Sequence, residues 1–255
     1  KMKIVIITQN DPFYLAKNLK YLISVLPDHS EIVGCVVSSV SPFGKKETFI
    51  KKAIKTYDIF GFGFFMYYSI KFLKSKLDKK TNIFRVLKEN NIPVINLEYP
   101  INEKQSVDRI KVFEPDLILS ILGNQIFKKP IIELAPKGCL NLHTALLPKY
   151  RGLMPTFWVM KNNEPTTGVS VFYVNKDIDS GPIIVQKEVE IGNKTQEELI
   201  ILTKQIGMIA IAESIDLIYK NEVKLIENDD SKKTYFSFPK REDVMEFRNN
   251  GKKFF

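Results

Sequence analysis

The sequence predicts an α/β protein, built as a doubly wound, mostly parallel sheet with a small C-terminal appendage. Two observations predict this fold. Short apolar runs, rich in β-branched residues, recur along the first 143 residues, and helical patterns separate most of them. Strands that are apolar throughout are typical of a parallel sheet covered by helices on both faces. The predicted strands of this part are Met2 to Thr8, Glu31 to Ser38, Val94 to Leu97, Leu117 to Leu122 and Cys139 to His143.

The helices between these strands follow from the spacing of their apolar residues. From Tyr14 to Val25, leucines recur at intervals of three and four residues, which places them on one face of a helix. Similar helical stretches lie around Asn82 to Glu89 and from Lys104 to Phe113.

After residue 143 the pattern changes. Thr195 and Glu198 form a capping box that starts a long helix. The tail after Val223 is polar with interspersed aromatic residues, and we expect a small hairpin and a helix there. The predicted elements before the tail are helices over Pro155 to Lys161 and Thr195 to Lys220, and strands over Thr167 to Tyr173 and Ile183 to Val189.

These elements divide the chain near residue 190. Residues 1–190 form the main domain, and residues 191–255 form the long helix plus a short C-terminal module for substrate binding or packing. Residues 41–80 are an insertion rich in aromatic residues and lysines. The favoured interpretation is a helical insertion that packs its Phe and Tyr face onto the domain. The alternatives are a substrate lid and a membrane-surface helix with lysines on its polar side.

Composition restricts the function class only broadly. A hydrophobic fraction of 44% and a charged fraction of 26% are ordinary for a folded globular protein. The net charge of +9 indicates an anionic partner such as a nucleotide, a nucleic acid or a membrane surface. Because the lysines are spread along the chain, a solvated basic face is favoured over a nucleic-acid patch. We therefore do not expect a nucleic-acid partner.

Three sequence features bear on where the protein resides and whether it holds a metal: its cysteines, its histidines and the length of its apolar runs. Cys35 and Cys139 lie far apart in apolar runs, which indicates buried thiols in a reducing environment. With only His29 and His143 and no Cys-x-x-Cys pair, no metal site is expected. The first apolar run is too short for a signal peptide, and Ile59 to Ile70 is too short to span a bilayer. We expect a cytoplasmic protein without a transmembrane segment, and a homodimer is an open alternative.

Three polar residues form the candidate chemical site. Asn141 and His143 flank Leu142 at the end of a predicted strand, so both side chains point to one side of the sheet. The carboxyl ends of strands are where open parallel sheets bind ligands. An imidazole can move a proton near neutral pH, and an amide can donate to a developing oxyanion. These two groups suit acyl transfer to an amine without a covalent enzyme intermediate.

Asp179 would complete the set. It lies in an Asp-x-Asp-Ser-Gly-Pro turn between two later strands. A carboxylate brought beside His143 would fix its tautomer and support its charged form. Singly, such a histidine is more often structural and such a turn is common. The hypothesis therefore depends on the combination.

The ordered motifs carry a family resemblance. Asn-x-His is followed by Leu-Leu-Pro-Lys-Tyr-Arg-Gly, then Thr-Gly-Val, then Asp-x-Gly-Pro-Ile-Ile, all between Leu117 and Glu190. This order closely resembles the formyltetrahydrofolate-dependent formyltransferases. That family includes glycinamide ribonucleotide, methionyl-tRNA and sugar N-formyltransferases. The resemblance implies a Rossmann-like catalytic domain over residues 1–190.

The resemblance also implies roles for individual residues. Asn141, His143 and Asp179 would be the catalytic trio, N10-formyltetrahydrofolate the formyl donor, and no metal would take part. Leu146 to Gly152 would form the active-site loop. The pterin pocket would be lined by the backbone of Leu122, Gly123, Asn124, Gln125 and Ile126 and closed by the turn from Asn175 through Asp177 to Asp179.

Within the family, the sequence looks most like the sugar N-formyltransferases. These act on deoxy-aminosugars, usually nucleotide-linked, that are used in surface polysaccharide biosynthesis. The loop Thr8 to Pro12 lacks the phosphate-binding glycines typical of glycinamide ribonucleotide formyltransferases. About thirty-five residues follow the long helix, too few for a tRNA-binding barrel. The candidate substrate contacts are Gln9, Asn10, Tyr150 and Arg151.

Several alternatives stay open. The acceptor could instead be methionyl-tRNA or glycinamide ribonucleotide, or the protein could hydrolyse the formyl donor and release formate. A non-catalytic binding module is disfavoured because all three polar residues are present. The tail segment Tyr235 to Pro239 could stack on a base, but anchoring the tail is favoured because aromatic residues mostly bury themselves. The sequence does not identify the sugar, its amine or the nucleotide.

Overall fold

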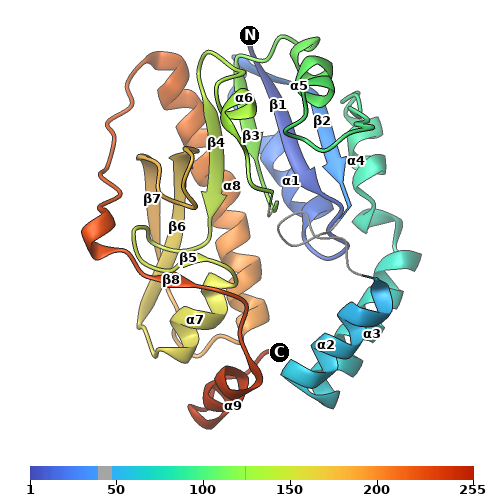
Figure 1. Cartoon of the computed structure of the whole chain (residues 1–255), viewed down its shortest axis with the longest axis vertical. Coiled ribbons are helices and arrows are strands. Elements are labelled where there is room, and N and C mark those ends of the chain that lie inside the picture. The colour runs from blue at the N-terminus through green and yellow to red at the C-terminus, as the bar shows by residue number, and fades with distance from the viewer. Residues whose placement is uncertain (40–47, 124) are drawn as a thin grey trace.

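The protein folds around one six-stranded mixed sheet with helices on both faces (Figure 1). The computed structural model describes residues 1–39, 48–123 and 125–255. The strand order is β2-β1-β3-β4-β6-β7. The predicted α/β fold with a mostly parallel sheet is confirmed.

Four strands form the parallel part of the sheet: β1 (Met2–Gln9), β2 (Ser30–Ser38), β3 (Leu117–Ser120) and β4 (Cys139–His143). Strand β6 (Thr166–Tyr173) pairs antiparallel with β4, and β7 (Ile183–Glu190) pairs antiparallel with β6. The predicted strand at Val94 to Leu97 is wrong. This segment makes only an isolated bridge between Val94 and Cys35 and then leaves the sheet.

Nine helices accompany the strands in the described ranges, and most begin within a residue or two of their predicted starts. In the predicted capping box, the Thr195 hydroxyl accepts a hydrogen bond from the Glu198 N–H. Thr195 is therefore the N-cap, and the long helix begins at Gln196, one residue after its predicted start. The helices are α1 (Leu15–Val25), α2 (Phe49–Phe60), α3 (Phe62–Leu77), α4 (Ile83–Glu89), α5 (Lys104–Lys111), α6 (Lys129–Ile132), α7 (Pro155–Lys161), α8 (Gln196–Lys220) and α9 (Arg241–Asn249).

The alternation of side chains along β1 explains why the core has two halves. Ile4 and Ile6 pack into the cluster that α1, α4 and α8 cover. Val5 and Ile7 point to the other face and pack with residues of α5 and α6. A strand buried on both faces is apolar throughout, as the sequence of β1 is. Among the described residues, no helix is long and apolar enough to cross a membrane.

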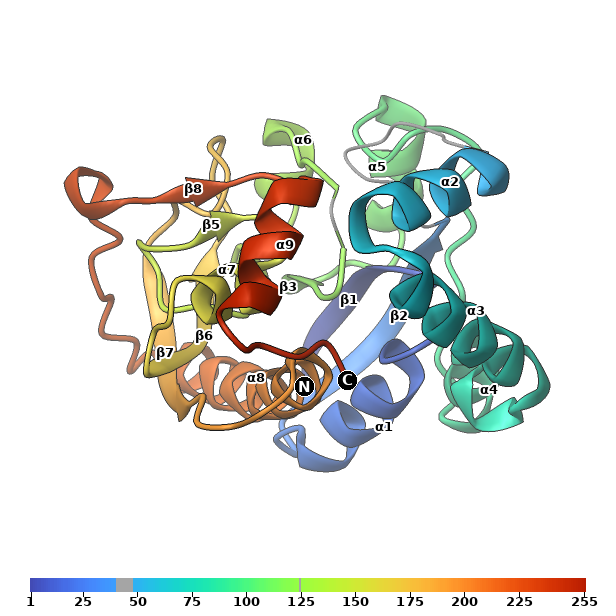
Figure 2. The same ribbon diagram turned by 90° about the horizontal axis from the view of Figure 1, so that it is seen from below.

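The C-terminal tail folds back across the domain and does not form the predicted hairpin. The two-residue strand β8 (Tyr235–Phe236) pairs in parallel with β5 (Arg151–Gly152), which lies in the loop after β4. Figure 2 shows β8 and α9 passing over β5 and α7. Phe247 and Phe254 then join Phe60 and Phe157 in a buried aromatic cluster. The tail is therefore part of the domain's packing.

Two glycines of the sequence motifs lie where the chain approaches itself too closely for a side chain. A Cβ on Gly168 would come within 2.2 Å of the Lys187 carbonyl oxygen of β7 and 2.4 Å of Leu146. A Cβ on Gly181 would lie 1.6 Å from the Tyr173 carbonyl oxygen. These glycines let the β6–β7 hairpin close against the loop after β4.

Gly168→Ala should lower the free energy of unfolding by about 1–3 kcal/mol, because β7 or Leu146 must move to make room. The control is Gly63→Ala in α3, where nothing lies within 4 Å of the added Cβ. That change should be neutral or stabilise by up to about 1 kcal/mol. Urea unfolding of both variants measures the difference. Equal stabilities would contradict this account of the Thr-Gly-Val motif.

Candidate active site

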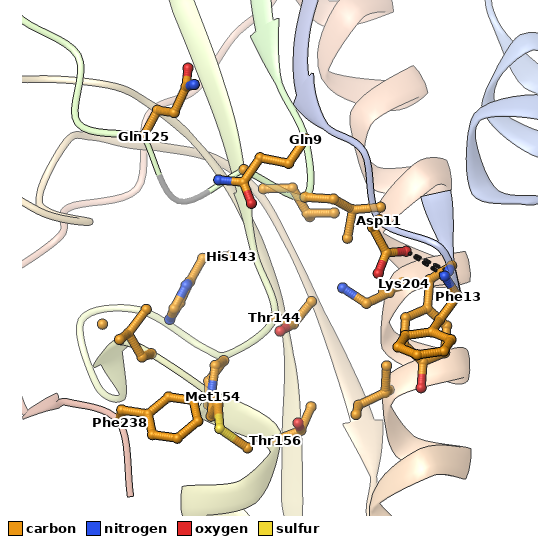
Figure 3. A pocket seen from close by; sticks show the side chains of 18 of the residues that line it. Gln9, Asp11, Phe13, Gln125, His143, Thr144, Met154, Thr156, Lys204 and Phe238 are labelled. Carbon is orange, nitrogen blue, oxygen red and sulfur yellow. Dashed lines mark hydrogen bonds between the residues drawn. The ribbon is translucent and has the colours of Figure 1, made fainter. Parts of the chain in front are cut away.

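The carboxyl ends of β1, β3 and β4 border a cavity of about 1060 Å³. Asn141 and His143 line it from β4, and Gln9 lines it from the end of β1. Figure 3 shows His143 and Gln9 at the cavity. Leu142, between the two polar residues, packs against the core that α8 covers. The strand-end geometry expected from the sequence is thus present.

His143 is anchored at one ring nitrogen. It is 7% exposed, and its Nε2 lies 2.6 Å from the Tyr150 carbonyl oxygen. Because a carbonyl only accepts, Nε2 carries the proton of this hydrogen bond. Its Nδ1 faces Asp179, with 3.6 Å to Oδ2, which is longer than a direct hydrogen bond. One nitrogen therefore holds the ring in place, while the other can exchange a proton beside a carboxylate.

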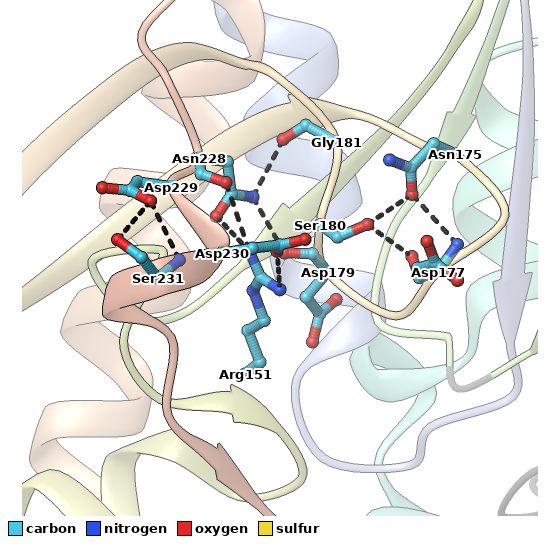
Figure 4. Close-up of polar contacts among 10 residues, drawn as sticks. All are labelled: Arg151, Asn175, Asp177, Asp179, Ser180, Gly181, Asn228, Asp229, Asp230 and Ser231. Carbon is cyan, nitrogen blue, oxygen red and sulfur yellow. Dashed lines mark hydrogen bonds and ion pairs between the residues drawn. The ribbon is translucent and has the colours of Figure 1, made fainter.

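Asp179 is held in place by its backbone and by one carboxylate oxygen. It lies at the tip of the β6–β7 turn in the left-handed conformation, with a φ of 49°. Its Oδ2 accepts from the Gly152 N–H at 2.9 Å. The Asn228 side chain donates to the Asp179 and Gly181 carbonyl oxygens, both at 2.9 Å (Figure 4). The structure therefore brings Asn141, His143 and Asp179 to one cavity, as predicted.

Arg151 ties the loop after β4 to the tail. Its guanidinium is buried, with Nη1 donating to Asp230 at 2.7 Å and Nη2 donating to the Asn228 side chain at 2.8 Å. Through this fork, Arg151 is bonded to Asn228, the residue that holds the Asp179 turn (Figure 4). Arg151 is not among the residues that line the cavity.

Tyr150 is also directed away from the cavity. Its hydroxyl donates to Glu164 at 2.6 Å, and its ring stacks on Phe236 with 5.3 Å between centroids. The structure thus places Gln9 and Asn10 at the cavity, but it does not place Tyr150 and Arg151 there. These two side chains anchor the loop and the tail instead.

The residues predicted to line a pterin pocket lie on one side of this cavity. Leu122, Gly123, Gln125 and Ile126 follow β3, and Asn124 lies outside the described residues. On the opposite side lies the Asn175–Asp179 turn, where the Asn175 carboxamide oxygen accepts from the Asp177 N–H at 3.1 Å and from the Ser180 hydroxyl at 2.6 Å.

Two buried amide atoms beside the cavity have no hydrogen-bond partner in the described part of the chain. They are Gln9 Nε2, a donor, and Gln125 Oε1, an acceptor. The other Gln125 atom, Nε2, donates to the Ser38 hydroxyl at 2.8 Å. Because an unpaired buried polar atom is costly, these groups fit a ligand that carries both donors and acceptors.

More of the cavity wall comes from two segments that the sequence analysis favoured as packing elements, with a role at the ligand only as an alternative. Helices α2 and α3 supply aromatic side chains, and the tail supplies Phe238. The predicted packing of the insertion is therefore partly correct. Phe60 is buried and Phe64 packs against the same cluster, whereas Phe65, Phe72 and others line the cavity. Apolar helical spacing alone does not distinguish a core-facing side chain from a cavity-facing one.

Lys204 is a further cavity residue that the sequence did not indicate. It extends from α8 beside Asp11 (Figure 3). The Asp11 Oδ2 accepts the Tyr14 and Leu15 N–H groups at the start of α1. Burial lowers the pKa of Lys204 to about 8, although the nearby Asp11 charge opposes this. The protein has 38 lysines and arginines, and no motif distinguishes this one. Within the described ranges, no group of His, Cys, Asp and Glu could hold a metal ion.

Comparison with known proteins identifies the family. The family model described as formyl transferase matches residues 74–215, which is more than half of the chain. This chain belongs to the formyl transferase family. The match runs from the last residues of α3 through most of α8 and includes all three residues of the candidate catalytic trio.

Individual relatives differ in how much they share with this chain. A methionyl-tRNA formyltransferase of Alkaliphilus oremlandii is 37% identical over 147 residues, which cover 57% of this chain and 47% of the relative. The chain spans about half the length of the curated relatives it matches.

Solved structures share the fold at lower sequence identity. One is an N-formyltransferase from Helicobacter canadensis in complex with folinic acid and dTDP-3-aminofucose. It has a TM-score of 0.61 and 20% identity, and the match covers 100% of this chain and 81% of that one. Another is a glycinamide ribonucleotide transformylase from Symbiobacterium toebii, with a TM-score of 0.61 and 14% identity, where the match covers 89% and 94%.

Lys204→Met should stabilise the protein at neutral pH and lose this advantage in alkali. The folded pKa of about 8 lies below the ordinary 10.5, so the native state loses its proton before the unfolded chain does. The charged lysine therefore destabilises the native state below about pH 8, and this penalty disappears as the pH rises toward 10.5. Urea unfolding across this range, with exposed Lys17→Met as control, measures the difference. A difference from the wild type that does not change with pH would contradict the burial of this ammonium group.

Proposed function

We propose that this formyl transferase moves a formyl group from N10-formyltetrahydrofolate to the amino group of a nucleotide-linked deoxy-aminosugar used in surface polysaccharide biosynthesis. The observation that carries the transfer chemistry is the convergence of Asn141, His143 and Asp179 at one cavity. The acceptor is argued separately, from the cavity wall and from the structural relatives.

The residues at the cavity fit a folate donor. A pterin ring presents donors and acceptors along one edge, which suits the unpaired amide atoms of Gln9 and Gln125. In the described part of the chain, the backbone N–H groups of Leu122 and Gly123 also make no main-chain hydrogen bond, although both residues line the cavity. When bound, the folate would supply an activated formyl carbon. The Asn175–Asp179 turn would close the pocket from the other side.

Asn141 and His143 then divide the chemistry. As the amine attacks, negative charge develops on the formyl oxygen, and the Asn141 amide donates a hydrogen bond to it. His143 Nδ1 takes a proton from the amine and delivers it to the departing nitrogen. Asp179 stabilises the charged imidazole directly or through one water, since the gap between them is 3.6 Å. The Tyr150 carbonyl keeps the ring oriented throughout.

The remaining cavity wall supports a nucleotide-linked acceptor. Lys204 lines it and offers positive charge to a diphosphate. Phe238, which is 40% exposed at the cavity, offers a face on which a base can stack. The structural relative with dTDP-3-aminofucose matches the whole of this chain. The C-terminal tail of this chain therefore has a counterpart in that structure.

Methionyl-tRNA is the second candidate acceptor. The observation that favours it is the 37% identity to a methionyl-tRNA formyltransferase, which is higher than the 20% identity to the Helicobacter canadensis N-formyltransferase. That identity covers 57% of the chain, so it reports the shared catalytic domain more than the acceptor.

A panel of acceptors tests the proposal. Purified protein is incubated with N10-formyltetrahydrofolate and, in separate reactions, nucleotide-linked aminosugars, methionyl-tRNA, glycinamide ribonucleotide or buffer alone. We expect a formylated aminosugar. Formylated methionyl-tRNA would transfer the assignment to the second candidate, and formate release in buffer alone, at the rate seen with acceptor, would make the protein a hydrolase.

Variants of the trio test the chemistry separately from the acceptor. Asn141→Ala should lower the rate about 100- to 1000-fold through loss of the oxyanion donor. His143→Ala should lower it about 100- to 10,000-fold. Both should retain wild-type circular dichroism and folate-induced thermal stabilisation. Near-normal rates in either variant would refute its assigned role.

A further inference from the structure

Helix α3 presents a continuous apolar stripe to solvent. Its members recur at intervals of three and four residues, which places them on one face of the helix. Their exposed fractions are high for large apolar side chains: Phe62 66%, Met66 39%, Ile70 47%, Leu73 64% and Leu77 86%. Exposed apolar patches of this kind mark interaction surfaces.

The other faces of α3 are occupied, so the helix cannot rotate to bury the stripe. Lys71 forms an ion pair with Glu197 of α8, and the Tyr67 hydroxyl donates to the same carboxylate at 2.5 Å. Phe64 packs on Phe60 and Phe254, with ring centroids 4.3 Å and 5.0 Å apart. The stripe therefore lies on the outer side of a hairpin that is fixed to the domain, and Leu73 at its edge also borders the cavity.

Helix α2 extends the apolar surface of the hairpin. Ile50, Ile54 and Tyr57 recur at helical spacing and are 69%, 56% and 50% exposed. Ring contacts pair Phe49 with Phe72 and Tyr57 with Phe65, so the two helices run antiparallel. Figures 1 and 2 show this hairpin at the periphery of the molecule, away from the sheet.

The positive charge of the hairpin indicates that the partner of the apolar stripe is anionic. Between Thr48 and Thr81 the chain carries eight lysines and only two acidic residues, Asp58 and Asp78. At about 100° per residue, Lys74 and Lys76 fall on opposite sides of the α3 stripe. Both are exposed, and their long stems can lie along an apolar phase while the ammonium groups reach a polar one.

We propose that the α2–α3 hairpin lies in the headgroup region of an anionic lipid bilayer, with the α3 stripe inserted and the flanking lysines on lipid phosphates. A basic amphipathic surface with large apolar side chains is what binds such an interface. A second copy of this chain is disfavoured as the occupant, because it would bring two lysine-rich hairpins together. Since α2 and α3 also wall the cavity, docking holds the active site next to the membrane.

Vesicle co-sedimentation tests this docking with the full chain. We expect binding to phosphatidylcholine vesicles that contain phosphatidylglycerol, release at high salt, and little binding to phosphatidylcholine alone. Met66→Glu/Ile70→Glu should lower the bound fraction at least about tenfold. The matched control is Ile201→Glu/Ile209→Glu on α8, whose side chains are 41% and 40% exposed; it should bind as the wild type does.

Charge reversal separates electrostatic from apolar attraction. Lys74→Glu/Lys79→Glu should lose most vesicle binding, whereas Lys17→Glu/Lys111→Glu, exposed elsewhere, should keep most of it. The proposal is overturned if the wild type does not bind anionic vesicles, or if the stripe variant binds as well as its control. It is also overturned if light scattering shows a wild-type dimer that Met66→Glu/Ile70→Glu converts to a monomer, because the stripe would then be a self-association surface.

Discussion

The buried guanidinium of Arg151 is the contact on which the geometry of the active site depends. It joins the loop after β4 to Asn228 and Asp230 of the tail. Next to it in the loop, the Tyr150 carbonyl holds His143 and the Gly152 N–H holds Asp179. Loss of this fork would leave the Asn228 carboxamide oxygen without its charged donor and weaken the tie between loop and tail, which the β5–β8 pairing and the Tyr150 N–H bond to the Thr234 hydroxyl also hold.

In this arrangement, backbone groups hold the catalytic side chains in place: a carbonyl oxygen holds His143, and an N–H group holds Asp179. Three segments far apart in sequence meet here: the end of β4, the β6–β7 turn and the tail near residue 228. Asn228 completes the enclosure by donating to two carbonyl oxygens of the turn that carries Asp179. Groups held in this way do not need to move when charge develops in the transition state. Such preorganised groups stabilise that charge most effectively.

The local features of this site were predictable from the sequence, whereas its supports were not. Alternation along Cys139–His143 placed Asn141 and His143 together because a strand has a two-residue period. The two-residue pairing of β5 with β8 has no period that a sequence pattern could reveal. Arg151 was predicted to contact the substrate, but its partners lie 77 and 79 residues further along the sequence, where no local pattern points to them. The α2–α3 insertion was recognised as helical and apolar, but its spacing could not show which faces the fold leaves exposed.

The most direct test of the account is a double-mutant cycle between His143 and Asp179. The kcat/KM of His143→Ala, Asp179→Ala and the double variant is measured with the acceptor that supports turnover. If Asp179 acts through the imidazole it faces, the double variant will be about as slow as His143→Ala alone. If the two losses multiply, the carboxylate and the imidazole act independently, and the coupled site described here is wrong.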